Sequence, residues 1–405
     1  MLSEKCEGVI QNYNLRAKLG DLLFFAFVPA EWKQSEAEGG GDNVPRNVCC
    51  DGAGRVLLLS NPLALSSIAP SLLLLYGQVE HTGYYEKQGH RSRICSLLKF
   101  LWQAPEHRPA FAKIAEVEKQ FLDFANGVLN EINELIVTMM ENLPFIKTTQ
   151  DEMKTAAWGA MSSEEQDNVS SKLSDAERNV KSALQLLNKA LDMFRYLSSD
   201  AKINELFQGP QMVKRLSSAL LYVLSNMLGS KGLELKVDNP DEYLFKPKEM
   251  LGDLCSILIQ FAESASFSDA IATSGYYNET IMTKLLSTCK KLNLLDGEGV
   301  GQLEDLVTGV QDAKKGAANL DHILQDAPDE VSTTHTRHAL KRFFSCACLQ
   351  SNTHVCCPVP RPAHVRDHDG SRVPGHEQEL LQPQHHFAAP HERRDGPVQQ
   401  AAAHD

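Results

Sequence analysis

The densest group of potential metal ligands lies near the C-terminus. Zn²⁺ prefers thiolate and imidazole ligands, and a short stretch holds four cysteines and three histidines: Cys346, Cys348, Cys356, Cys357, His335, His338 and His354. Their spacing fits no compact zinc knuckle, and the alternative that this tail is not an evolved protein segment is favoured. Cys49 and Cys50 have no second ligand pair nearby. We therefore predict no metal site.

The remaining residues that could take part in catalysis or ligand binding are isolated histidines and one cluster of glycines. Four histidines are scattered without a Ser or Cys arrangement that indicates nucleophilic catalysis, so we expect surface or packed side chains: His81, His90, His107 and His322. Gly297, Gly299 and Gly301 are spaced like a phosphate-binding loop, but no strand precedes them and no basic residue follows at the required distance. A loop connecting two helices is expected there. We predict no catalytic residue and no cofactor.

The amino-acid composition limits the kinds of molecule that this protein is expected to bind. The 405 residues carry a formal charge of −12 and are 42% hydrophobic, which supports a buried core. Nucleic acids and anionic membranes favour clustered Lys and Arg, so this balance argues against both and favours protein partners.

The chain is expected to be soluble and intracellular, without membrane insertion. Its first residues show no basic segment before an apolar core, and the apolar run 66–76 is interrupted by Pro70 and short for a bilayer. Cys95, Cys255 and Cys289 are then reduced thiols. The sequons at Asn168 and Asn278 are chance matches.

Helical periodicity dominates residues 111–326. One apolar stripe runs from Ile114 to Met139, and a second, from Val180 to Leu197, follows a capping box predicted at Ser174 and Glu177. Further helices are expected over 210–229, from 247 onward, over 281–292 and over 303–324, with the polar stretch 147–172 as a linker and residues 32–60 as an insertion. No stretch alternates as a strand would. The fold is predicted as all-α, either an irregular solenoid or stacked bundles.

The stretch Gly232–Leu251, GLELKVDNPDEYLFKPKEML, resembles the signature of the ubiquitin elongating factor core. Further segments agree in order: NYNLRAKLGDLL from Asn12, VEHTGYYEKQGHRSRI from Val79, LKFLWQAPEHRPAF from Leu98, FLDFANGVLNEINEL from Phe121, and the run to ILQDAPDE, which ends at Glu330. The resemblance covers most of residues 12–330 and departs near residue 40, and the family's N-terminal part is missing. It implies an armadillo-like solenoid followed by a U-box, which docks a ubiquitin-conjugating enzyme and positions ubiquitin without a nucleophile of its own.

The tail departs from that pattern after Glu330. Ten of the fourteen histidines and seven of the eighteen prolines fall in residues 331–405, where the helical pattern stops. Codons for Val359–His364, shifted by one base, can spell Phe-Leu-Asp-Pro-Leu, the expected opening of a U-box, and the same shift over 396–404 can spell its closing motif. Residues 331–358 are typical of a translated intron, with possible splice sites at both ends. We expect a retained intron plus a frameshift, and a disordered tail.

These observations predict two domains: residues 1–330, the core, and residues 331–405, an aberrant tail replacing the U-box. The resemblance implies a ubiquitin-ubiquitin ligase family that elongates polyubiquitin chains for proteasomal and endoplasmic-reticulum-associated degradation in cytoplasm and nucleus. Implied partners are ubiquitinated client proteins, a segregase-type ATPase and, once the U-box is restored, a ubiquitin-conjugating enzyme. This chain alone is expected to be inactive. The alternative is a non-catalytic α-solenoid scaffold for protein partners.

Overall fold

The computed structural model describes residues 10–28, 53–233 and 235–325, and these residues form helices and no strands, which confirms the all-α prediction. The predicted tail, its cysteines and histidines, Cys49 and Cys50 lie outside the described residues. In chain order the elements are α1 (Tyr13–Phe27), α3 (Ala53–Ser60), α4 (Pro62–Gln78), η2 (Val79–His81), α5 (Tyr84–Gln103), α6 (Arg108–Phe111), η3 (Ala112–Glu116), α7 (Glu118–Met153), α8 (Ala156–Ala160), α9 (Ser163–Leu197), α10 (Ala201–Phe207), α11 (Val213–Leu228), η4 (Ser230–Leu233), η5 (Pro240–Tyr243), α12 (Pro247–Ile259), α13 (Ala265–Thr273), α14 (Glu279–Leu292) and α15 (Gly297–Gln325).

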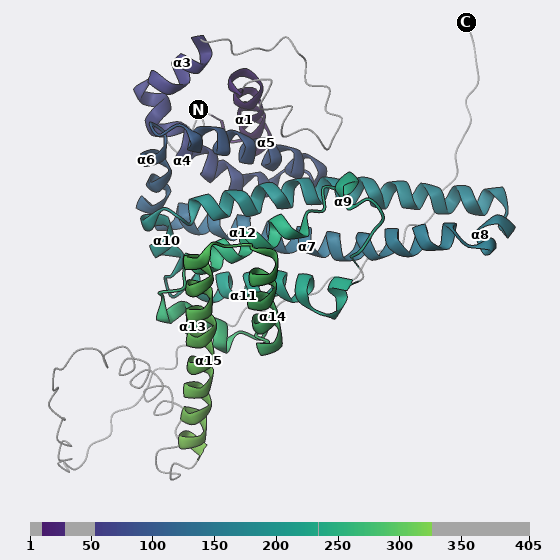
Figure 1. The fold of residues 1–405 in the computed structure, drawn as a ribbon. Helices are drawn as coiled ribbons and strands as arrows, with labels where there is room; N and C mark the ends of the chain where they lie inside the picture. Colours follow the sequence, from purple (N-terminus) through teal and green to yellow (C-terminus); the bar gives the residue numbers. More distant parts are fainter. Residues whose placement is uncertain (1–9, 29–52, 234, 326–405) are drawn as a thin grey trace, which may run out of the picture. The chain divides into compact units, whose positions relative to one another are not determined.

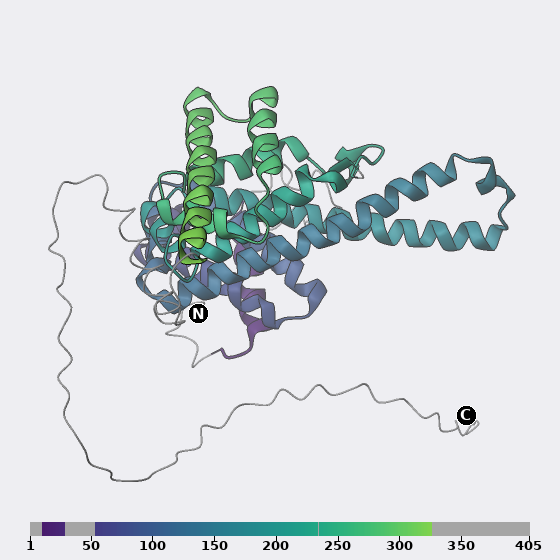
Figure 2. The same ribbon diagram turned by 90° about the horizontal axis from the view of Figure 1, so that it is seen from below.

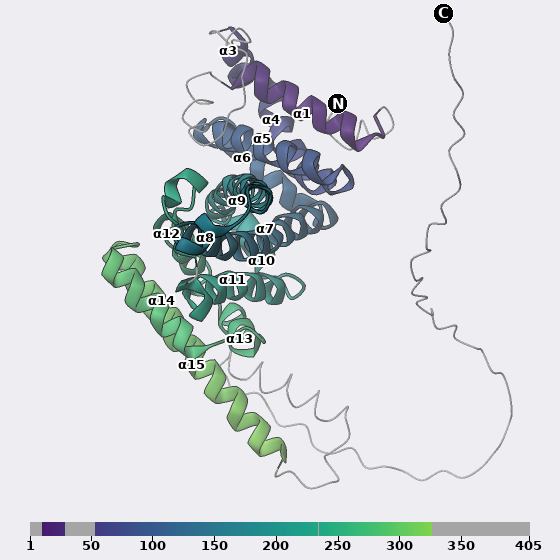
Figure 3. The same ribbon diagram turned by 90° about the vertical axis from the view of Figure 1, so that its right-hand side faces the viewer.

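The helices stack in layers that follow the order of the chain (Figure 3). Helices α1, α4 and α5 form one end, α7 and α9 the middle, and α11 to α15 the other end. Each layer packs on the next, with α4 against α7, α5 against α9, α7 against α11 and α12 against α9. This is the irregular helical solenoid expected when each helix pair must bury its apolar stripe against a neighbour.

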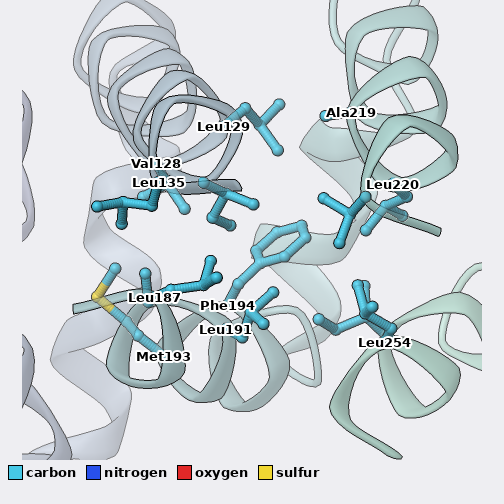
Figure 4. Packing of buried hydrophobic residues seen from close by; sticks show 14 of the residues in the cluster. Val128, Leu129, Leu135, Leu187, Leu191, Met193, Phe194, Ala219, Leu220 and Leu254 are labelled. Atoms are coloured by element: carbon cyan, nitrogen blue, oxygen red, sulfur yellow. The ribbon is translucent and has the colours of Figure 1, made fainter. Parts of the chain in front are cut away.

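Helices α7 and α9 form the central antiparallel pair, 36 and 35 residues long. Their apolar residues recur every three or four positions, and this places one stripe of each helix against the other. Figure 4 shows Phe194 of α9 lying among side chains of α7, α11 and α12, including Leu135, Leu220 and Leu254, and all four side chains are buried. Each contributes about 1.5–3 kcal/mol to stability by leaving water.

The predicted linker over 147–172 does connect two helices, but its bounds are wrong, because α7 continues to Met153 and α9 already begins at Ser163. Leu143 and Ile146 before this stretch and Leu173 and Ala176 after it are buried. Within the stretch most side chains are partly or fully exposed, since only two helices are paired here (Figure 1). A narrow apolar stripe makes a helical stretch appear polar in composition.

The capping box also lies elsewhere. Ser162 Oγ accepts a hydrogen bond from the Glu165 amide at 3.3 Å, and the Glu165 carboxylate accepts from the Ser162 amide at 2.9 Å. Ser174 and Glu177, which repeat the same Ser-x-x-Glu spacing, lie inside α9. A capping box therefore begins α9, as predicted, but at Ser162 and Glu165 instead of Ser174 and Glu177.

Pro70 does not interrupt its helix. Proline lacks the amide that would bond to the carbonyl four residues earlier, which here belongs to Ser66, and Lys113 Nζ donates to that carbonyl at 3.0 Å. Helix α4 therefore continues to Gln78, and Pro62–His81 is long and apolar enough to cross a bilayer. Its second half, Ala69 and Ser71–Tyr76, is buried in the protein core, which accounts for much of this apolar character.

Other helix ends agree with the predictions or correct them locally. Helix α11 ends before Gly229 as expected but begins at Val213, and α12 begins at Pro247. Gly297, Gly299 and Gly301 lie within the first turns of α15 rather than in a loop, because Asp296 Oδ1 accepts from the Gly299 amide at 2.8 Å and caps the helix. Helix α3 occupies the end of the predicted insertion.

Candidate functional site

The family signature forms a loop that joins three helices. Between η4 and α12, Leu235, Val237, Tyr243 and Phe245 are buried at spaced positions. The turn is closed by the Phe245 amide, which donates to the Pro240 carbonyl at 3.0 Å. A loop with this many buried side chains is held in one conformation by its neighbours.

Two residues of the signature loop have left-handed backbone conformations. Asn239 has φ 50° and Leu244 has φ 58°. Asparagine tolerates this region, whereas leucine adopts it rarely and at a cost in energy. The Leu244 carbonyl accepts a hydrogen bond from Asn188 Nδ2 at 2.9 Å, which fixes this residue against α9.

Tyr243 connects the signature loop to both long helices. Its hydroxyl donates to Glu177 of α9 at 2.9 Å and accepts from Gln150 Nε2 of α7 at 3.1 Å. Burial, together with the Glu177 carboxylate, raises the pKa of Tyr243 to about 12. Lys154 pairs with Asp238 of the loop at 2.6 Å. The signature thus holds the outer parts of α7 and α9 together.

A polar groove of about 780 Å³ opens beside this loop, between α5, α9 and the start of α12. Its size is that of a ligand-binding cleft. It is lined by Cys95, Ser96, Lys99, Gln103, Gln185, Asn188, Lys189, Asp192, Arg195, Tyr196, Leu244, Lys246, Glu249, Met250, Gly252, Asp253, Ser256 and Leu294.

Ion pairs cross the floor of the groove. Arg195 of α9 contacts Asp192 of the same helix and Asp253 of α12, the latter at 2.8 Å. Asp192 also pairs with Lys99 of α5 at 3.2 Å. Burial raises the pKa of the Asp253 carboxyl to about 6; Arg195 opposes the rise and Asp192 adds to it. The groove therefore carries charges of both signs and suits binding of polar groups.

Two polar side chains of the groove are paired with each other, because Lys189 Nζ donates to Ser96 Oγ at 2.9 Å. Cys95 also lines the groove, and its Sγ lies 3.8 Å from Met193 Sδ. Within the described ranges, no three His, Cys, Asp or Glu side chains are grouped to hold a metal ion. What this surface can do is bind and position another molecule.

The structure places the predicted histidines far apart, in separate packing roles. His90 Nδ1 lies 3.1 Å from Asp21 Oδ1, and His107 Nε2 lies 3.1 Å from the Leu58 carbonyl. Burial lowers the pKa of His107. The His81 ring lies beside Tyr13, with centroids 5.0 Å apart. His322 lies on α15, and its side chain is not described.

The three predicted core thiols are buried and form no disulfide. Cys255 of α12 and Cys289 of α14 are in hydrogen-bonding contact with each other. Burial, together with this neighbour, raises the pKa of Cys255. Asn278, the residue of one sequon, caps α14 by accepting from the Thr280 amide at 2.9 Å. These residues have structural roles in the described part of the chain.

A buried charge cluster was missed by sequence reasoning. Arg91 is fully buried, pairs with Glu131 of α7 and with Glu80 at 2.8 Å, and donates to the Tyr76 carbonyl at 3.2 Å. Lys87 pairs with Glu80 at 3.1 Å. Three of these charged residues, Glu80, Lys87 and Arg91, lie in the family segment VEHTGYYEKQGHRSRI. That segment is the sequence signal from which the cluster could have been predicted. The cluster joins α4, η2, α5 and α7.

Comparisons with a family model and with individual known proteins point to the same family. The family model of the ubiquitin elongating factor core matches residues 4–311. The chain is 28% identical over 298 residues to the probable ubiquitin conjugation factor E4 of Arabidopsis thaliana, covering 71% of this chain and 28% of that protein. It is 26% identical over 336 residues to the E4 ubiquitin-protein ligase UFD2 of Saccharomyces cerevisiae, covering 80% and 33%. The ubiquitin conjugation factor E4 of Schizosaccharomyces pombe is 26% identical over 334 residues, covering 79% and 30%. The chain thus spans about a third of the length of these relatives.

Proposed function

The chain belongs to the ubiquitin elongating factor core family, and on this premise we propose that its helical array is the scaffold of a ubiquitin chain-elongation factor. In this role it holds partner proteins so that ubiquitin is added to a growing chain elsewhere in the assembly. Positioning of reactants supplies much of the acceleration in such transfers, so the scaffold requires no nucleophile of its own.

The observation that carries the proposal is the structural role of the signature loop. It ties α7, α9 and α12 into one unit through Tyr243, Asn188 and the buried Phe245, and it forms one wall of the polar groove. A family motif used to fix the relative positions of helices is what a scaffold needs.

The finer parts of the proposal follow from the resemblance. We propose that a U-box recruits the ubiquitin-conjugating enzyme, that it is encoded one base out of frame after Glu330, and that the chain as written is inactive alone. Its clients are ubiquitinated proteins destined for the proteasome, including those of endoplasmic-reticulum-associated degradation, delivered with a segregase-type ATPase in cytoplasm and nucleus. Transcript sequencing tests the frame, because an uninterrupted message through residues 331–358 in the present frame contradicts it.

Chain extension in vitro tests the function. A ubiquitinated test substrate, activating and conjugating enzymes and ubiquitin are incubated with this chain or with a frame-repaired version that carries the U-box. We expect longer chains only with the repaired version. Equal products from both chains would refute the role given to the missing module, and no extension by either would refute the elongation role itself.

The second candidate is a non-catalytic scaffold that binds protein partners without any transfer, and the mixed-charge groove is compatible with it. Binding of the frame-repaired chain to an immobilised, ubiquitin-charged conjugating enzyme discriminates between the two. The scaffold hypothesis predicts no binding, whereas the elongation proposal predicts binding that disappears when the U-box is removed.

A further inference from the structure

A second groove, of about 450 Å³, opens between α7, α11 and the segment that joins α13 to α14. It shares no lining residue with the polar groove beside the signature loop. Figures 1 and 2 show α11 beside α7, whose far end continues with α9 as a projecting hairpin. We call this second surface the α7–α11 groove. Its volume is sufficient for a few residues of a bound peptide.

One part of the α7–α11 groove is aromatic and apolar. The rings of Tyr222 on α11 and Tyr276 lie edge to face, with centroids 5.4 Å apart, and Val137 of α7 lines the same surface. Tyr276 is 50% exposed and Val137 is 39% exposed, so the fold leaves these side chains accessible. Tyrosine is frequent among the residues that anchor partners, because its rigid ring offers a large apolar area. This part of the groove therefore suits a large apolar side chain.

The groove also contains a guanidinium group that is available to a carboxylate. Arg215 Nη2 donates to Asn130 Oδ1, a neutral acceptor, at 3.0 Å. Among the described residues, no acidic side chain forms an ion pair with Arg215. Glu134, which also lines the groove, is paired with Lys87 at 3.0 Å. Since a guanidinium can hold a carboxylate through two parallel hydrogen bonds, this end of the groove is complementary to an acidic side chain.

Asn133 of α7 adds a polar group that lacks a partner. Its Oδ1 is buried and accepts no hydrogen bond from the described residues. Such an atom costs free energy and requires an explanation. The terminal amide turns readily about its last side-chain bond, and it can donate to a peptide carbonyl and accept from a peptide N–H. Asn133 is thus suited to bind the main chain of an extended segment.

We propose that the α7–α11 groove binds an extended segment of a partner protein in which an acidic side chain lies next to a large apolar one. The apolar side chain packs on Tyr276, the carboxylate pairs with Arg215, and the main chain bonds to Asn133. Such binding involves no transfer of ubiquitin, so it does not depend on the proposed function.

An array of synthetic peptides tests this specificity. Each peptide has a Gly-Ser backbone with one central pair of residues, and the pairs cover all combinations of two amino acids. We expect the fluorescently labelled full chain to bind best where Asp or Glu adjoins a large apolar residue. The formal charge of −12 disfavours acidic peptides, so the charge of the whole chain does not produce this preference. Absence of binding, or equal binding of acidic and basic pairs, would overturn the proposal.

Variants of the groove locate the binding site. Arg215→Glu should reverse the preference, so that pairs containing Lys or Arg bind best, because the charge facing the ligand is then negative. Arg215→Gln should remove the preference without reversing it, which keeps the test available if the Glu variant is poorly folded. Asn133→Ala should weaken binding of the best peptide about tenfold without lowering the Tm, since its Oδ1 has no partner to lose.

Arg178→Glu is the matched control for charge reversal. Arg178 is also exposed on a helix, pairs with Asp175 and does not line the α7–α11 groove. This variant should keep the preference of wild type for acidic pairs, and thermal unfolding followed by circular dichroism shows whether each variant is folded. A preference that survives in both Arg215 variants, or that is lost equally in the Arg178→Glu chain, would overturn the assignment of this groove.

Discussion

At the scale of single residues, the most consequential side chains are charges that the fold has removed from water. Arg91 and Glu131 lie on different helices and are both almost fully buried. A buried ion pair adds little net stability, yet removal of one partner leaves an uncompensated charge in a medium that solvates it poorly.

We therefore expect Arg91→Ala to lower the free energy of unfolding by about 3–5 kcal/mol. Urea denaturation followed by circular dichroism measures this loss. The double variant Arg91→Leu/Glu131→Leu should recover part of it, because neither charge of this pair is left buried alone and Lys87 keeps Glu80 as its partner. The surface pair Arg178–Asp175 provides the control, since both side chains are largely exposed and its disruption should change little. A small effect of Arg91→Ala would contradict the assigned burial.

Asp253 is expected to make stability depend on pH in the opposite direction to an ordinary paired carboxylate. Its pKa is raised to about 6 in the folded protein, so the folded state binds the proton more tightly than the unfolded state. Stability from this group is present below its unfolded pKa and is lost as the pH rises through about 6. Asp253→Asn should therefore match wild type near pH 4 and exceed it by up to about 3 kcal/mol above pH 7. Urea denaturation curves across this range measure the difference, and a constant offset would contradict the assignment.

At the scale of elements, the approach of α4 to α7 depends on two glycines. A Cβ on Gly77 would lie 2.9 Å from the Asp123 carbonyl oxygen of α7, and a Cβ on Gly127 would lie 3.2 Å from the Gly77 Cα. Because both obstacles are backbone atoms, relief requires the helices to separate.

We expect Gly77→Ala to destabilise the protein by about 2 kcal/mol, as overpacking in a close helix contact does. Thermal unfolding of the variant, compared with Gly316→Ala, measures it. Gly316 lies in α15, where a Cβ would meet no other atom within 4 Å, so alanine should be tolerated or slightly stabilising there. Equal Tm values for the two variants would show that α4 and α7 can separate freely.

At the scale of the whole molecule, the core extends along the chain to α15. Among the residues whose burial is described, Leu303, Leu306, Val307 and Val310 are the last buried apolar ones. The first half of α15 is therefore packed against α12, α13 and α14, and the residues from 311 to 319 are partly or fully exposed.

A chain that ends at Gln325 is accordingly expected to keep the Tm of the full chain, because it retains every buried core residue that the structure describes. Differential scanning calorimetry of the two proteins tests this. A loss of several degrees on truncation would show that the tail contributes to the fold, and would contradict the prediction that residues 331–405 are an aberrant segment. An unchanged Tm agrees with that prediction.

The sequence by itself determined the helical class, the apolar stripes of the two longest helices, α7 and α9, and the family. Periodicity at three and four residues reports a helix face directly, because neighbouring turns of one helix decide it. The signature Gly232–Leu251 identified the family, but its structural role as a link between α7, α9 and α12 was not readable from its residues.

Only the tertiary structure decided which of the local sequence patterns form the structural feature that they predict. Pro70 is accommodated because Lys113, 47 residues away in sequence from Ser66, supplies a donor, and of two equivalent Ser-x-x-Glu patterns only Ser162 and Glu165 begin a helix. The groove likewise joins Lys99, Asp192 and Asp253 from three helices. Such outcomes depend on partners brought together by packing, and the spacing of residues within one segment contains no information about them.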